Sequence, residues 1–454
     1  MADRSRKPKL SLRALVDKEK NKLVLVETCK DFVDILFGFL KLQMGTIARL
    51  VNKQSQQTYV GCFSNIYKSV LDMDIDNFLS EACKTMLLYP RSVEDDLFRR
   101  LKVNVNETTE ECKFFICPRF NTSKCSCGKK MEMKIEVKNA SKLGNDVDGV
   151  FVCGKPSFII TDDMTVRSNS SNVYLQVVKD QGCVDVDKLS ESLLVIGSEE
   201  VLTLLECVFS SNIPLTDAFL RKQSSRNMNL LNKPLSPALE EYKNEANSDR
   251  LTLNVVVRKE DRKVLFFECR EDFVNLLFTF LAVSLEFGLE ASGDNMVMGC
   301  ILNLFGSFND LTFDKKSRLK PKSTLPYYSF FGGRRLLRLY GDRIVFGVEN
   351  LVQLKHICPH SVQSVSSHCN ACKGFVKQNM KFRVTDDLII TPLSSSSTIG
   401  CLEQFQVSLA DVDVQEISIG KAEVNNVLRA SFMTSTVLTN ALWNLLVKKP
   451  KQET

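Results

Sequence analysis

Alternating apolar and polar residues open the chain and predict a β-hairpin. The alternation begins at Leu10, meets a polar turn at residues 17–21 and resumes in LVLVE at residues 23–27. The spacing becomes helical from about Asp31, and a second helical segment follows at residues 62–72. A hairpin followed by helices is therefore the expected start of the fold.

Two long apolar runs predict buried helices. They occupy residues 32–51 and 273–291. Charged residues such as Lys41, Arg49 and Glu286 interrupt them before either run reaches the roughly 20 apolar residues that a membrane span needs. We expect core helices and no membrane span.

The pattern after these helices mixes strands with helices. A β-rich run, CKFFICP, starts at residue 112 and leads into a cysteine-rich hairpin. VFVCGKPSFIITDD at residues 150–163 reads as strand, EEVLTLLECVFSS at 199–211 as a closing helix, and LTDAFL at 215–220 as a short helical turn. Because no strict strand–helix–strand rhythm appears, the expected class is α+β, with β-hairpins or sheet, several helices and a cysteine-rich hairpin in each domain.

The pattern occurs twice. Residues 10–40 align without a gap to residues 251–281, with 14 of the 31 positions identical. GCFSNIYKS is answered by GCILNLFGS, FIITDDM by FRVTDDL, IGSEEV by IGKAEV and LTDAF by LTNAL, in the same order. We therefore expect two homologous tandem domains rather than a solenoid. The predicted organisation is a basic tail at 1–9, a first repeat domain at 10–222, a linker at 223–249, a second repeat domain at 250–447 and a tail at 448–454.

Composition fits a folded intracellular protein. Apolar residues make up 44% and charged residues 25% of the 454 positions, as in globular proteins. The net charge of +6 is small for this length and by itself indicates no nucleic-acid partner. The first residues lack the apolar stretch of a secretory signal, so we expect the cytoplasm or nucleus, where the 16 cysteines act as thiols or metal ligands rather than disulfides.

Several of these motifs resemble one plant family. The hairpin-plus-helix opening, CSCGKKM, the TDDL-type strand end, the serine run in TPLSSSS and the LT(D/N)A ending are similar, in this order, to the plant domain of unknown function 674 family. The resemblance covers nearly the whole chain and implies a plant protein, in a family whose members often carry two such units in tandem. The family has no assigned activity, so the resemblance implies no catalytic residues.

The cysteine clusters are candidate zinc sites. Cys369 and Cys372 have the spacing of a metal knuckle, and Cys358 and His360 could complete a four-ligand site of the structural kind. The corresponding part of the first repeat offers no histidine and a poorer C-x-C turn; its candidate ligands are Cys112, Cys117, Cys125 and Cys127. The alternative is that all these residues are ordinary surface thiols. The metal content of the purified protein distinguishes the two.

Familiar catalytic constellations do not fit the repeat. All three histidines, His356, His360 and His368, lie in the second cysteine cluster, so an activity shared by both repeats uses no imidazole base. No HExxH, GxSxG, Walker A or GxGxxG motif occurs either.

Two recurring features suggest structural roles instead of catalytic ones. The Thr-Asp-Asp sequences at 161–163 and 385–387 place adjacent carboxylates on opposite faces of a strand, which favours capping of a turn. Cys62 and Cys300 follow a glycine at the start of an apolar helix, which favours buried packing thiols.

A basic stretch at residues 315–338 interleaves lysine and arginine with tyrosine and phenylalanine, a composition suited to single-stranded nucleic acid or to a solvated loop. It has no counterpart in the first repeat. The leading hypothesis is a non-enzymatic binding or scaffolding protein with protein partners. An enzyme of unrecognised type and nucleic-acid binding are the alternatives.

Overall fold

The computed structural model is mixed α+β, as the sequence predicts. It describes residues 9–54, 61–78, 81–89, 151–152, 157–182, 185–221, 250–292, 299–312, 339–340, 343–344, 375–394, 399–400, 402–403 and 405–447. Below, residues 9–221 are called the first half and residues 250–447 the second half. The structure does not test the predicted domain boundaries, and the predicted linker, residues 223–249, lies outside the described residues.

The first half contains a five-stranded antiparallel sheet with the order β4-β3-β2-β1-β5. The predicted hairpin is confirmed as its centre. Its turn is closed by Asp17, whose carboxylate accepts hydrogen bonds from the backbone N–H groups of Glu19 and Lys20. The strands are β1 (Leu10–Asp17), β2 (Lys22–Thr28), β3 (Phe158–Thr161), β4 (Val166–Ser168) and β5 (Leu189–Ile196).

The second half contains a sheet of the same design, with the order β11-β10-β7-β6-β12. Its strands are β6 (Leu251–Arg258), β7 (Val264–Arg270), β10 (Lys381–Thr385), β11 (Ile390–Pro392) and β12 (Val412–Ile419). The two sheets thus fit the repeat in the sequence. A separate two-stranded ladder joins β8 (Leu339–Tyr340) to β9 (Arg343–Ile344).

Neither long apolar run forms the single helix expected: the first forms two helical segments and the second forms three. The first divides into α1 (Lys30–Lys41) and α2 (Met44–Gln54), and the second into α9 (Glu271–Thr279), the short 3₁₀ helix η6 (Phe280–Ala282) and α10 (Leu285–Ser292). At the break Met44 N donates to Val283 O at 2.8 Å and Leu285 N donates to Leu42 O at 2.9 Å. The two breaks therefore satisfy each other's backbone groups across the halves.

The remaining helices lie around these segments, and none in the described part of the chain combines the length and apolar character of a membrane span. In the first half they are α3 (Phe63–Asp72), η1 (Ile75–Asn77), α4 (Glu81–Leu88), α6 (Ser171–Asp180), η3 (Val186–Lys188), α7 (Ser198–Ser210), α8 (Pro214–Thr216) and the π-helical turn η4 (Asp217–Arg221). In the second half they are α11 (Gly299–Leu311), η7 (Leu409–Asp411), α14 (Lys421–Met433) and α15 (Val437–Leu446).

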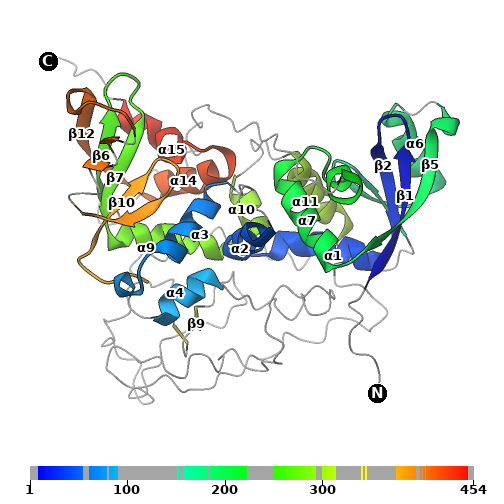
Figure 1. Cartoon of the computed structure of the whole chain (residues 1–454), viewed down its shortest axis with the longest axis horizontal. Coiled ribbons are helices and arrows are strands. Elements are labelled where there is room, and N and C mark those ends of the chain that lie inside the picture. The colour runs from blue at the N-terminus through cyan, green and yellow to red at the C-terminus, as the bar shows by residue number, and fades with distance from the viewer. Residues whose placement is uncertain are drawn as a thin grey trace.

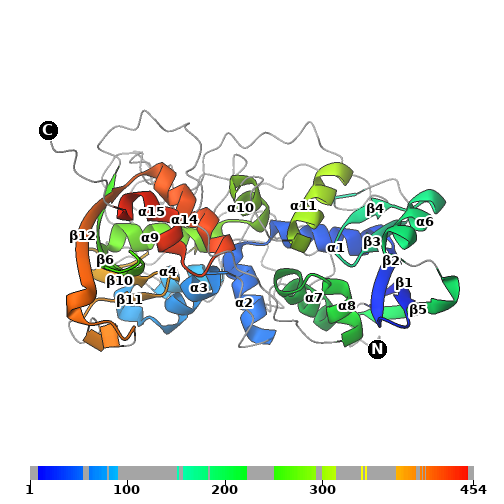
Figure 2. The same cartoon turned by 90° about the horizontal axis from the view of Figure 1, so that it is seen from above.

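The two halves exchange a helix. Helix α3 of the first half packs on β11 of the second sheet, and α11 of the second half packs on β4 of the first. Figure 1 shows blue α3 among the green, orange and red elements of the second half, and yellow-green α11 beside α7 of the first half. Seen from above, one sheet lies at each end of an elongated body, with α1, α2, α10 and α11 between them (Figure 2).

One hydrophobic core runs through both halves. The largest cluster of buried apolar side chains contains residues of both sheets and of the helices between them. Aromatic rings meet across the halves: Phe37 and Phe308 have centroids 5.3 Å apart, and Phe63 and Phe432 have centroids 4.5 Å apart. Separating the halves would expose these side chains to water, so hydrophobic burial holds the halves together.

Gly61 lies at a close contact between the first half and the second. Its φ of +55° is strained for other residues, and an added Cβ would lie 2.4 Å from the carbonyl oxygen of Ser431. Gly182 has a similar φ of +71° but no atom within 4 Å of such a Cβ. The two glycines therefore share the backbone strain and differ in the clash.

We expect Gly61→Ala to destabilise the protein more than Gly182→Ala in urea unfolding. The left-handed backbone alone costs about 1–2 kcal/mol. Overpacking at Gly61 adds roughly 1–3 kcal/mol. Equal losses of unfolding free energy would contradict the close contact between the halves.

Candidate functional site: the Thr-Asp-Asp turns

Each Thr-Asp-Asp sequence forms a tight turn after its strand. In the first half the Asp163 carboxylate accepts hydrogen bonds from the Thr161 hydroxyl and from the backbone N–H of Thr165. In the second half the Asp387 carboxylate accepts from the Thr385 hydroxyl. The capping role expected for these aspartates is confirmed.

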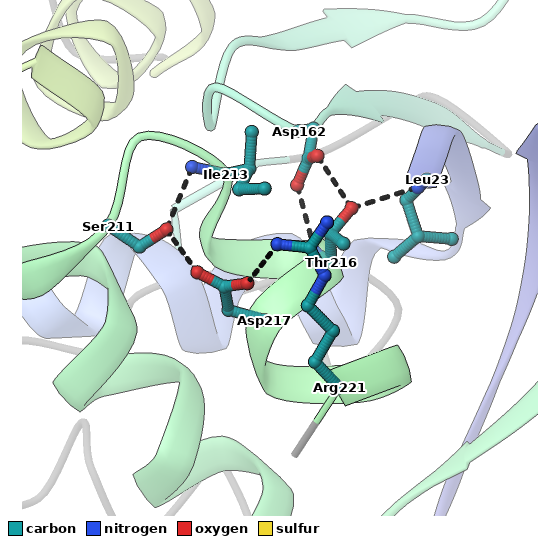
Figure 3. A network of polar contacts seen from close by, with 7 residues as sticks. All are labelled: Leu23, Asp162, Ser211, Ile213, Thr216, Asp217 and Arg221. Carbon is teal, nitrogen blue, oxygen red and sulfur yellow. Dashed lines mark hydrogen bonds and ion pairs between the residues drawn. The ribbon is translucent and has the colours of Figure 1, made fainter. Parts of the chain in front are cut away.

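The middle aspartate ties the turn to the C-terminal end of its half. Asp162 is buried, and its two oxygens accept from the backbone N–H of Thr216 at 2.9 Å and from the Thr216 hydroxyl at 2.6 Å. The same hydroxyl accepts the backbone N–H of Leu23 in β2 at 2.8 Å (Figure 3). One threonine thus joins β2, the turn and α8.

The second half repeats this tie with Asp386 and Thr439. Asp386 is buried and accepts from the backbone N–H and the hydroxyl of Thr439, both at 2.8 Å. The Thr439 hydroxyl accepts from the N–H of Val264 in β7 at 2.9 Å. The TDD and LT(D/N)A motifs therefore recur together because the aspartate of one bonds the threonine of the other in each half.

The residue after each threonine differs between the halves. Asp217 accepts from the Ser211 hydroxyl at 2.6 Å and from the Arg221 guanidinium at 3.2 Å (Figure 3). The Ser211 hydroxyl in turn accepts a hydrogen bond from the N–H of Ile213. The Asp217–Arg221 ion pair and Ser211 thus hold the segment between α7 and α8. Asn440, its counterpart, instead donates to the hydroxyls of Thr434 and Thr436.

The exchanged helix α11 docks directly on the first turn. Asn303 donates its amide to the carbonyl oxygen of Asp163 at 2.9 Å, and the Ser307 hydroxyl accepts the N–H of Val166 at 2.9 Å. The Cys300 thiol donates to the carbonyl oxygen of Ser211 at 3.4 Å. The first two contacts satisfy backbone groups of the turn and of edge strand β4, and the third satisfies the C-terminal end of α7.

Helix α3 makes the equivalent contacts in the opposite direction. Asn65 donates to the carbonyl oxygen of Asp387 at 2.7 Å, the Ser69 hydroxyl accepts the N–H of Ile390 at 2.8 Å, and the Cys62 thiol donates to the carbonyl oxygen of Thr434 at 3.4 Å. The shared G-C-x-x-N-x-x-x-S sequence is thus a docking motif. Its cysteine, asparagine and serine lie three and four positions apart, on one face of a helix.

Burial perturbs the ionisation of these groups. Desolvation raises the pKa of Asp162 from 3.8 to about 6, although the hydrogen bonds from Thr216 oppose the shift. Desolvation likewise raises the pKa of Asp386 from 3.8 to about 6. It raises the pKa of the Cys300 thiol to about 12, so that this cysteine stays protonated near neutral pH.

The predicted packing role of Cys62 and Cys300 is confirmed, since both are buried. Their hydrogen bonds to the opposite half were not foreseen. The available signal was the identity of the glycine, cysteine, asparagine and serine in the two copies.

The cysteine-cluster residues Cys358, His360, Cys369, Cys372, Cys112, Cys117, Cys125 and Cys127 lie outside the described residues, as do residues 315–338 of the basic stretch. Their roles in binding zinc or nucleic acid stay predictions. Within the described ranges, no group of three or more His, Cys, Asp and Glu side chains is arranged to hold a metal ion.

A family model described as "Protein of unknown function (DUF674)" matches residues 6–422. The chain belongs to this family. DUF674 carries no activity in its description, so membership places the chain among its relatives without assigning a reaction. No curated protein and no solved structure matches the chain.

We expect Thr216→Val to destabilise the first half. The nearly isosteric change leaves the Leu23 N–H and one Asp162 oxygen buried without their partner, at about 1–3 kcal/mol for each unsatisfied group. Thr203→Val is the matched control, because the Thr203 hydroxyl bonds Glu199 O at the protein surface. Urea unfolding should show a change within about 0.5 kcal/mol for the control. Comparable losses for both variants would contradict the role of Thr216.

The buried aspartates should make the folded state more stable in mild acid. Each carboxyl has a folded pKa of about 6 above its ordinary 3.8, so the folded protein binds the proton more tightly. This contribution is complete below pH 4 and is lost as the pH rises through 6. Between pH 7 and pH 5 each carboxyl should add about 1 kcal/mol to the unfolding free energy. Asp162→Asn combined with Asp386→Asn removes both carboxyls, so it should flatten the pH dependence by about 2 kcal/mol over this range. If the wild type and the double variant showed the same dependence of unfolding free energy on pH, the raised pKa values of Asp162 and Asp386 would be disproved.

Proposed function

We propose that the protein is a non-enzymatic scaffold that binds protein partners along its outermost strands, β5 and β12. The observation that carries the proposal is that these two eight-residue strands lie at opposite ends of the molecule (Figure 1). Among the described residues, β5 pairs only with β1, and β12 only with β6. Each leaves one backbone edge unpaired within that part of the chain.

The side chains of these strands support the same role. Leu193 and Val195 on β5 are 65% and 52% exposed, and Val414 on β12 is 65% exposed. Leu193 and Val195 are two positions apart, so they point to the same face of the sheet. An extended partner segment added beside β5 would pair with the free backbone edge and cover these side chains.

The polar groups of the turns support a structural rather than a catalytic use. Asp162 and Asp386 already accept hydrogen bonds on both carboxylate oxygens, and they are buried. Burial also raises the pKa of the Cys207 thiol to about 12, which disfavours the nucleophilic thiolate. Asp162, Asp386 and Cys207 are thus all withdrawn from any substrate.

The exchanged helices give the scaffold its rigidity. Because each sheet is completed by a helix from the other half, the two outer strands are held at a fixed separation. Two partners bound at the two ends would then be held at that separation as well. This is the sense in which the protein would act as a scaffold.

Site-specific photo-crosslinking on the full-length protein tests the proposal. A photoreactive residue at the exposed Ser192 of β5 should join a partner protein through one extended segment. Leu193→Glu with Val195→Glu should reduce that product at least tenfold and leave the melting temperature unchanged, since both positions are exposed.

The matched control is Leu409→Glu, an apolar residue 78% exposed outside the strands. It should leave the crosslink intact. Equal crosslinking in all variants, or equal loss in the control, would sink the proposal.

A further inference from the structure

One ion pair between the halves has no counterpart in the sequence repeat. Lys41, the last residue of α1, pairs with Glu286 in the first turn of α10. Both side chains are largely buried, with 18% and 20% exposed. The Lys41 ammonium also lies 5.3 Å from the ring centroid of Phe308 on α11. Lys41 thus contacts two groups of the second half at once.

The repeat shows why this pair occurs once. Extending the gap-free alignment places Lys41 on Ala282 and Glu286 on Gly45. The isolated β-bridge between Gln43 and Ser284, which are aligned positions, lies beside the ion pair. Around this bridge each half donates one equivalent backbone hydrogen bond to the other half. The charged side chains, by contrast, do not occupy equivalent positions.

Because the lysine lies in the first half and the glutamate in the second, the ion pair favours pairing of a first half with a second half. Two first halves brought together in this way would place each Lys41 against Gly45, with no carboxylate. Two second halves would place each Glu286 against Ala282, with no ammonium. A charge that is mostly withdrawn from water and has no partner opposes association. Only a first half with a second half matches both charges.

The contacts that join the halves do not depend on the peptide between them. Hydrogen bonds from α3 and α11, the aromatic contacts and the ion pair all connect residues 9–78 or 157–221 to residues 250–447 through space. The same contacts would form if the complementary half came from another chain. Whether they form within or between chains is then set by the effective concentration of the linked half.

We propose that the surface each half presents to the other is an assembly site for the complementary half of a second copy of this chain, and that Lys41 and Glu286 restrict it to that half. Two chains can then form a closed dimer in which each first half is completed by the partner's second half. This inference concerns the interface between halves and is independent of binding at β5 and β12.

Charge reversal in two separately tagged full-length chains tests the proposal. A Lys41→Glu chain alone brings two glutamates together, and a Glu286→Lys chain alone brings two lysines together, within or between copies. When the two chains are mixed, unfolded and refolded at high concentration in reducing buffer, exchange of halves creates two matched pairs. We expect a species that carries both tags, has twice the 51.3 kDa chain mass and melts several degrees above either variant alone.

Two further samples complete the design. A single chain with both Lys41→Glu and Glu286→Lys should refold with the wild-type proportions of monomer and dimer, because the reversed pair is matched. Its melting temperature should lie slightly below that of wild type, because the contact between the Lys41 ammonium and the Phe308 ring is lost. Differently tagged wild-type chains, refolded together at high concentration, should also give some dual-tagged dimer. If single variants precipitate, recovery of soluble protein only from the mixture is the supporting result. Absence of dual-tagged species from both mixtures would overturn the proposal, and so would dual-tagged dimer from Lys41→Glu chains alone.

Discussion

The structure depends on the reciprocal docking of α3 and α11. Each of these helices satisfies backbone groups of the other half through residues in equivalent positions. The asparagine and the serine bond the Thr-Asp-Asp turn and the edge strand, and the cysteine bonds the C-terminal end of a helix. A buried N–H or C=O without a partner costs about 1–3 kcal/mol, so neither sheet is complete without the helix from the other half. The apolar core, which continues from one half into the other, has the same consequence.

The Thr-Asp-Asp turn makes both local hydrogen bonds and hydrogen bonds to residues distant in the sequence. Its third residue closes the turn, its second residue holds the C-terminal helical segment through a threonine, and its backbone receives the exchanged helix. A charged side chain is placed in the interior there and costs desolvation, which its hydrogen bonds only partly offset. This arrangement makes the turn a junction of the fold.

Much of the local structure could be predicted from the sequence. Alternation predicts β1 and β2, helical spacing predicts α1, α3 and α7, and the Thr-Asp-Asp sequence at a strand end predicts a capped turn. The break between α1 and α2 could not be predicted, because no proline or glycine marks Leu42 and its hydrogen bond comes from Leu285 in the other half. The sequence also could not predict that α3 packs on the second sheet, because an apolar helix face indicates burial but does not identify the element that buries it. The Asp162–Thr216 contact joins residues 54 positions apart, and only the joint recurrence of their motifs signals it.

The shared core and the exchanged helices imply that the two halves unfold as one cooperative unit. Calorimetry of the full-length protein tests it most directly, through the ratio of calorimetric to van't Hoff unfolding enthalpy. The exchanged helices and shared core predict one transition with a ratio near one. Two transitions, each with about half of the total enthalpy, would show that the halves fold independently and would contradict the account.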